Sequence, residues 1–136
     1  MPDADIFRCD TEKPVAQFVR DLGVAAAKKG FLIHNEDKME MVHTFGRHGV
    51  EVAAGFDLHM LQICNPQKAA VSMQQNPERA LLIPKFIIVF TKDGKTCVRM
   101  LRISGQLTAA LLDDAAFPAS LEQSYDTIVE IIERAC

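Results

Sequence analysis

The sequence predicts a single α+β domain in which a strand and a helix are followed mainly by strands and then by a long final helix. Three observations support this: a helical stripe of apolar residues that ends at Gly30, an Asp93-Gly94 turn between two apolar runs, and an amphipathic stretch at the end of the chain. The length of 136 residues suits one domain, so we expect a single domain over residues 1–136.

The first elements are a short strand and a helix. Residues 6–9 form a short apolar stretch, and Asp10 or Thr11 then offers a helix N-cap. Gly30 stands where a C-cap glycine belongs, after two lysines that suit the negative helix end. Residues 31–33 are predicted to form a second strand. The apolar residues at helical spacing between these points are Val15, Phe18, Val19, Leu22 and Ala26.

The stretch from residue 35 to 55 carries the weakest pattern. It favours a short helix that ends at Gly46 or Gly49. The apolar residues that would line this helix are Met39, Val42 and Phe45.

Residues 56–64 are predicted to be extended, with apolar side chains at both parities. Phe56 and Leu58 belong to one face, whereas Leu61 and Ile63 belong to the other. Since neither face is cleanly polar, we expect a strand that is covered on both faces.

A short helix and a hairpin follow. Asn65 is a good N-cap and Pro66 suits the first helical position, so a short helix is expected up to about residues 76–77, with Ala69, Ala70 and Met73 facing inward. Residues 86–90 give the strongest strand pattern, and a return strand is expected over residues 96–103. The Asp-Gly pair between them favours a type I′ turn.

The chain ends in a predicted long amphipathic helix. Ser120 and Gln123 have the spacing of a capping box, although Pro118 is an alternative start. Residues 104–112 favour another short helix. The apolar stripe of the final helix consists of Leu121, Tyr125, Ile128, Ile131, Ile132 and Ala135.

Composition excludes several classes of function. The net charge of −3 provides no basic footprint for nucleic acid, and no run approaches the ~20 apolar residues that span a bilayer. The acidic start of the chain lacks a signal-peptide pattern, so a cytoplasmic location is expected. The four cysteines have no Cys-x-x-Cys pair, and we expect free thiols with no disulfide framework and no zinc site.

A family resemblance rests on motifs in order along the whole chain. Ile63-Cys64-Asn65-Pro66 is followed by Asn76-Pro77, then by Leu82-Ile83-Pro84 and the strand at 86–90, and Lys29-Gly30-Phe31 closes the first helix. Together these motifs resemble the domain-of-unknown-function family 302 of microbial proteins. The resemblance implies a β-α-β4-α, helix-grip-like core with an antiparallel sheet packed against the C-terminal helix, and commonly a homodimer. It implies no established activity.

Cys64 is the most notable side chain of these motifs. It lies just before a predicted helix N-terminus, which favours a thiolate or a bound anion. Many family members carry a cysteine just after the Leu-x-Pro motif, where this sequence has Lys85, and this weakens a two-cysteine redox or metal site. Lys85 would lower the thiol pKa if the strand ends are neighbours. The alternative is that Cys64 is a buried apolar side chain and Asn65-Pro66 only caps a helix.

Other candidate chemistry lacks a matching pattern. His34, His43, His48 and His59 form no His-x-x-x-His pair and have no acidic partner at ligand spacing, so no metal site and no cofactor are expected. The methionines are interpreted as core-filling side chains.

Three hypotheses follow. The first is a non-enzymatic, homodimeric module that binds a small apolar or anionic ligand between the sheet and the final helix, near Cys64, Asn65, Pro66 and Lys85. The second is thiol-based redox or sulfur-carrier chemistry at Cys64. The third is a structural or protein-interaction subunit. No nucleic-acid or membrane partner is expected.

Overall fold

The computed structural model describes residues 3–36 and 38–136. Residues 1, 2 and 37, which belong to the acidic start of the chain and to the predicted helical region, lie outside the described residues. The elements follow in the order β1 (Ala4–Thr11), α1 (Val15–Lys28), β2 (Leu32–His34), α2 (Met41–Arg47), β3 (Leu58–Cys64), α3 (Pro66–Gln75), a 3₁₀ turn η1 (Pro77–Leu81), β4 (Lys85–Lys92), β5 (Lys95–Ile103), α4 (Gly105–Leu111) and α5 (Phe117–Ala135).

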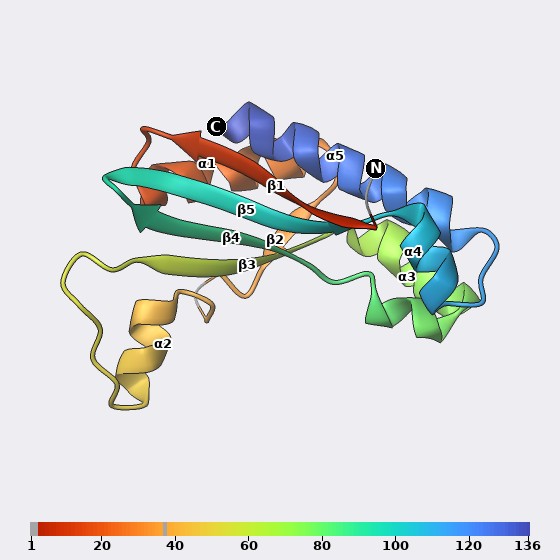
Figure 1. The fold of residues 1–136 in the computed structure, drawn as a ribbon, viewed down its shortest axis with the longest axis horizontal. Helices are drawn as coiled ribbons and strands as arrows, with labels where there is room; N and C mark the ends of the chain where they lie inside the picture. The colour runs from red at the N-terminus through yellow and green to blue at the C-terminus, as the bar shows by residue number, and fades with distance from the viewer. Residues whose placement is uncertain (1–2, 37) are drawn as a thin grey trace.

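The strands form one antiparallel sheet in the order β1-β5-β4-β3-β2, and the long helix α5 packs on it beside α1 (Figure 1). This confirms the predicted α+β class and the β-α-β4-α order. Helix α2 lies beyond β3, away from α1 and α5 (Figure 1). No helix among the described residues is long and apolar enough to cross a bilayer.

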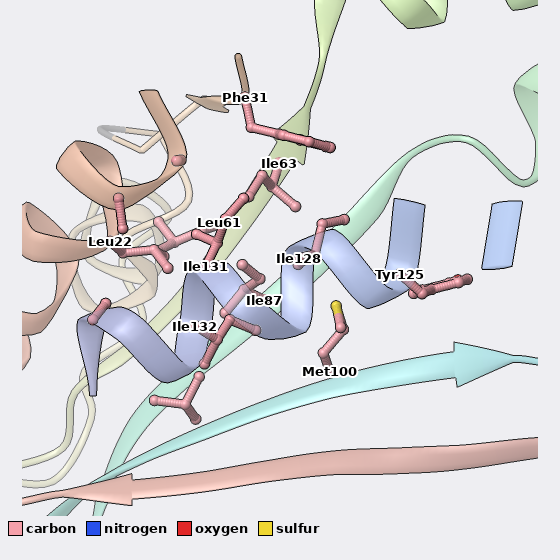
Figure 2. Close-up of a cluster of buried hydrophobic side chains, with 14 of the residues drawn as sticks. Leu22, Phe31, Leu61, Ile63, Ile87, Met100, Tyr125, Ile128, Ile131 and Ile132 are labelled. Atoms are coloured by element: carbon pink, nitrogen blue, oxygen red, sulfur yellow. The ribbon is translucent and has the colours of Figure 1, made fainter. Parts of the chain in front are cut away.

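The core lies between the sheet and the two long helices. Figure 2 shows Ile128, Ile131 and Ile132 of α5 meeting Leu61 and Ile87 of the sheet. All five side chains are at most 1% exposed. Because burying one such side chain contributes about 1.5–3 kcal/mol, this layer holds the strands and helices in place.

Local signals in the sequence explain several boundaries. Gly30 has a φ of +79°, and the N–H groups of Gly30 and Phe31 donate to the carbonyls of Ala27 and Ala26, as in a Schellman motif. Asp93 and Gly94 both have positive φ, as the predicted type I′ turn requires. The predicted short helices appear as α2 and α4.

Two predicted N-caps are wrong, although the alternative start of α5 at Pro118 lies next to the observed one. Helix α1 begins after Pro14, with no side-chain cap from Asp10 or Thr11. Helix α5 begins at Phe117 rather than at a Ser120 capping box, because Asp114 Oδ1 accepts hydrogen bonds from the N–H groups of Ala116 and Phe117. Pro118 occupies the first turn, where its missing N–H is not needed.

The strand β3 is buried on one face only. Leu61 and Ile63 face the core, whereas Leu58, Met60 and Gln62 on the other face are half-buried. Within one chain the expected cover on both faces is not complete, because no long helix of the described residues packs on the outer face. Ala70, expected to face inward, is exposed, although Ala69 and Met73 pack on the core.

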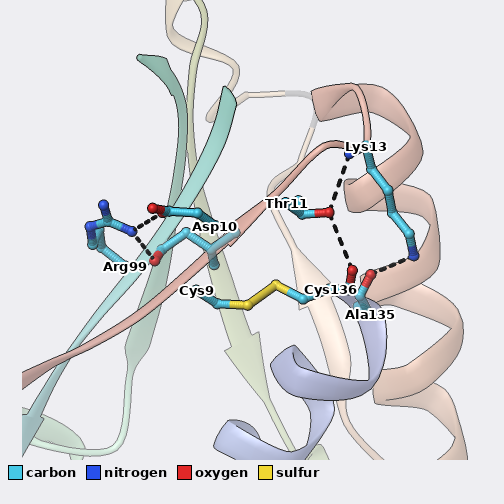
Figure 3. Close-up of a disulfide and its surroundings, with 8 residues drawn as sticks. Cys9, Asp10, Thr11, Lys13, Arg99, Ala135 and Cys136 are labelled. Atoms are coloured by element: carbon cyan, nitrogen blue, oxygen red, sulfur yellow. Dashed lines mark hydrogen bonds and ion pairs between the residues drawn. A yellow bond between two sulfur atoms is a disulfide. The ribbon is translucent and has the colours of Figure 1, made fainter. Parts of the chain in front are cut away.

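The expectation of four free thiols is also wrong. A disulfide joins Cys9 of β1 to Cys136, which follows α5, and only Cys64 and Cys97 are free (Figure 3). Next to it, Lys13 Nζ donates to the carbonyl of Ala135 at 2.6 Å and Thr11 Oγ1 donates to that of Cys136 at 3.2 Å. The end of α5 is thus held against the start of the chain, because the fold brings together cysteines that are 127 residues apart.

An ion pair fixes the other end of α5. Arg79 of η1 binds Asp114 through two hydrogen bonds of 2.6 and 3.0 Å, and Asn76 donates to the same carboxylate at 2.9 Å. The Arg79 guanidinium holds the pKa of Asp114 well below its usual range. This network sets the position of α3 and η1 relative to α5, and therefore shapes the space between them.

Candidate functional site

The turn from β3 into α3 is built by Asn65 and Pro66, as the sequence predicted. Asn65 Oδ1 accepts a hydrogen bond from Lys68 N at 3.1 Å, and Pro66 occupies the first helical turn. Gly30 approaches closely, since a Cβ at Gly30 would lie 3.4 Å from Asn65 Nδ2. The two sequence motifs that contain Gly30 and Asn65 therefore meet in space.

Lys85, the first residue of β4, lies beside this turn and is 7% exposed. Its Nζ donates to the carbonyl of Ile83 at 2.9 Å and lies 5.3 Å from the centre of the Tyr125 ring. Among the described residues, no carboxylate lies within ion-pair distance of this ammonium. An ammonium has three N–H donors, and burying such a charge without a counter-ion is unfavourable.

The electrostatics of the site follow from that burial. Desolvation lowers the pKa of Lys85 to about 8, with a small opposing effect from Cys64. Desolvation also raises the pKa of the Cys64 thiol, although the Lys85 charge opposes the rise. Burial likewise raises the pKa of Tyr125. Lys85 is therefore the group around this site that would change charge near neutral pH.

A small pocket opens at Lys85, between α3, α5 and the start of β4. Its volume is about 50 Å³, which is space for a few water molecules or for a small anion. The polar side chains that line it are Asn65, Lys68, Ser72, Lys85, Ser120 and Ser124. The set offers two ammonium groups, an amide and three hydroxyls, and contains no carboxylate.

The structure brings two of the four predicted site residues into this pocket. Asn65 and Lys85 line it, whereas Cys64 and Pro66 are not among its lining residues. Cys64 is half-buried and pairs with Leu32 in the β2–β3 ladder, and Pro66 is exposed.

Sequence reasoning missed the hydroxyl side of the pocket. Ser120 and Ser124 are one helical turn apart on α5, a spacing that places both hydroxyls on one face. That spacing was a usable signal, but Ser120 was interpreted as a capping residue. Lys68 and Ser72 have the same four-residue spacing on α3.

A larger groove adjoins the pocket between α3 and α5. It has a volume of about 500 Å³ and shares Lys68, Ser72 and Ser120 with the pocket. Val71 and Ala116 contribute apolar surface to it. A molecule with an anionic end in the pocket therefore has room for a larger body in the groove.

One group of possible metal ligands lies elsewhere among the described residues. Glu40, Asp57 and His59 place one ligand atom each within 4.8 Å of the others. These residues were not predicted as a site, because Glu40 is distant in sequence and meets His59 through an isolated bridge.

Comparison with known proteins identifies the fold. A family described as "Domain of unknown function DUF302" matches residues 7–135. The crystal structure of an uncharacterized conserved DUF302 protein from Bacillus stearothermophilus is similar, with a TM-score of 0.79 and 16% sequence identity, over 96% of this chain and 98% of that chain. No curated protein matches the sequence.

Proposed function

Because this chain belongs to the DUF302 family, whose description assigns no function, we propose a function from the geometry of its pocket: the protein is a non-enzymatic module that binds a small anion at Lys85. The observation that carries the proposal is a buried ammonium that pairs with no carboxylate of the described residues and faces a pocket lined by polar side chains. A phosphate or carboxylate group would supply the missing counter-charge and accept hydrogen bonds from Lys85, Ser120 and Ser124.

The same observations favour an anionic ligand over a wholly apolar one. An apolar group in the pocket would supply no counter-charge to the Lys85 ammonium, which already donates to the Ile83 carbonyl, and burying a charge without a counter-ion is unfavourable. The adjoining groove, with Val71 and Ala116 in its wall, would hold the rest of a ligand whose head group is the anion.

The alternative of thiol chemistry at Cys64 has less support. It requires a thiol pKa below the ordinary value, because the thiolate is the nucleophile. Burial instead raises the pKa of Cys64, and the charge of Lys85 opposes this without being the larger effect. Cys64 also lies outside the lining of the pocket.

The third hypothesis, protein interaction, is supported by the outer face of the sheet. Ile6, Leu101 and Phe86 are exposed large apolar residues on the neighbouring strands β1, β5 and β4, and their side chains point away from the helices. Leu32 of the edge strand β2 is exposed on the same face. Contiguous apolar surface of this kind is typical of interaction sites. We propose that a second copy of this chain covers it, so that the binding module is a homodimer.

Calorimetric titration with inorganic phosphate tests the anion site. The wild type is expected to bind phosphate, and Lys85→Met is expected to lose at least about tenfold in affinity because a charge-assisted contact contributes roughly 1.5–3 kcal/mol. Lys92→Met, at the exposed end of β4, is the matched control and should bind as the wild type does. Equal affinity of Lys85→Met and the wild type would exclude this location.

A further inference from the structure

A second polar cluster lies at the edge of β3, separate from the anion pocket. Glu40 precedes α2 and forms an isolated bridge with His59, and Asp57 precedes β3. His59 Nε2 lies 3.0 Å from Asp57 Oδ1, and one ligand atom from each of the three residues lies within 4.8 Å of the other two. All three residues are partly buried.

The spacing of these atoms suits a metal ion. Two ligands that bind one ion at 2.0–2.2 Å in neighbouring positions are about 3.0–3.5 Å apart, which is the separation of His59 Nε2 and Asp57 Oδ1. The Glu40 ligand atom lies within 4.8 Å of the other two, which is close enough for one ion to contact all three residues after small shifts.

Two further features describe the surroundings of the cluster. His59 is 15% exposed, and its Nδ1 is buried without a hydrogen-bond partner among the described residues. This is not the nitrogen beside Asp57, so an ion in the cluster would bind Nε2, and the buried Nδ1 calls for a water molecule instead. In addition, no Lys or Arg among the described residues pairs with Glu40 or Asp57.

We propose that Glu40, Asp57 and His59 bind a divalent first-row transition metal such as Zn²⁺. One ring nitrogen and two carboxylates are a donor set that Zn²⁺ accepts, whereas Ca²⁺ and Mg²⁺ prefer oxygen ligands alone. An open cleft of about 490 Å³, lined by Glu40 and His59, gives an ion access and leaves positions for water. The Glu40 carboxylate also accepts from the N–H groups of Val42 and His43, which fixes it at the start of α2.

Calorimetric titration with Zn²⁺ in a Cys64→Ser background tests the site, because that substitution removes the partly exposed free thiol as a competing ligand. We expect one ion per chain, and at least a tenfold loss of affinity in His59→Gln and in Glu40→Gln. His48→Gln, which changes an exposed histidine outside the cluster, should bind Zn²⁺ with the same affinity as the Cys64→Ser protein.

The absorption spectrum of Co²⁺ in the same background gives a second measurement. Nitrogen and oxygen ligands should produce weak d–d bands without thiolate charge transfer, and His59→Gln should remove them. Glu40→Gln keeps an oxygen at the start of α2, so this variant separates loss of the metal from loss of the fold. Absence of stoichiometric Zn²⁺ binding, or unchanged affinity in both variants, would overturn the proposal.

Discussion

At the scale of single residues, Lys85 is the most informative side chain in the protein. A lysine in the core between a sheet and a helix is unfavourable for folding, because desolvation penalises its charged form. The Tyr125 ring and one backbone carbonyl offset only part of this. A residue that lowers stability and faces a pocket is typical of sites where function is maintained at the expense of stability.

The burial of Lys85 predicts a pH dependence of stability. Its pKa is about 8 in the folded protein and about 10.4 in an unfolded chain. Below pH 8 the residue is charged in both states and the full penalty is present. Between pH 8 and about 10.4 the unfolded state binds more protons, so this residue makes stability rise with pH.

Replacing Lys85 should therefore remove this rise. We expect Lys85→Met to increase the free energy of unfolding at pH 7 by on the order of 1–3 kcal/mol, measured by urea denaturation. The rise in the free energy of unfolding that Lys85 causes above pH 8 should be absent in this variant. Lys92→Met, which replaces an exposed lysine, should change the free energy of unfolding little. A Lys85→Met protein that is less stable than the wild type at pH 7 would show that the ammonium has a stabilising partner.

At the scale of elements, the disulfide joins the first strand to the end of the last helix. It closes a loop that spans almost the whole chain, because Cys9 and Cys136 are 127 residues apart. A cross-link over so long a loop restricts the unfolded state strongly, and native disulfides of this kind contribute about 2–5 kcal/mol.

Cys136→Ser is expected to lower the free energy of unfolding by about 2–4 kcal/mol in urea denaturation without reductant. Excess dithiothreitol should lower the free energy of unfolding of the wild type to a similar value, and it should leave that of Cys136→Ser unchanged. The hydrogen bonds from Lys13 and Thr11 to the end of α5 remain in both cases and limit the loss. A wild type that is insensitive to dithiothreitol would contradict a stabilising role for this bond.

At the scale of the whole molecule, the two faces of the sheet differ in what covers them. Helices α1 and α5 cover one face (Figure 1). On the other face Leu101 is 62% exposed, and Ile6, Leu32 and Phe86 are exposed as well. A second copy on this face would explain why several strands carry apolar side chains on both faces of the sheet.

Light scattering after gel filtration tests this arrangement. The wild type should be a dimer, and Leu101→Asp should shift it to a monomer by placing a charge in the interface. Val24→Asp, at an exposed position of α1 away from the outer face of the sheet, should remain a dimer. A monomeric wild type would refute the proposed pairing.

The parts of the fold that the sequence predicted are those that local interactions determine. The Schellman end of α1 at Gly30, the Asp93-Gly94 turn and the Asn65 cap each depend on residues close in sequence. Only Asn65 and Lys85 of the predicted site share a pocket, because its other wall is formed where α3 meets α5.

The remaining features depend on contacts between distant segments. The disulfide requires the ends of the chain to meet, and the His59 cluster requires Glu40 to lie beside β3. Neither leaves a characteristic spacing in the sequence. The Ser120 capping box was wrong for a related reason, since the Arg79–Asp114 pair, formed between distant segments, holds Asp114 where it accepts from the N–H groups of Ala116 and Phe117.

The central claim is that Lys85 provides the positive charge of an anion site, and the pKa of its side chain tests this most directly. NMR titration of the lysine side chains, assigned with Lys85→Met, should give a pKa near 8 for Lys85 in phosphate-free buffer. Saturating phosphate should raise that pKa, because a bound anion stabilises the ammonium. An unperturbed pKa, or a low pKa that phosphate does not move, would contradict the account.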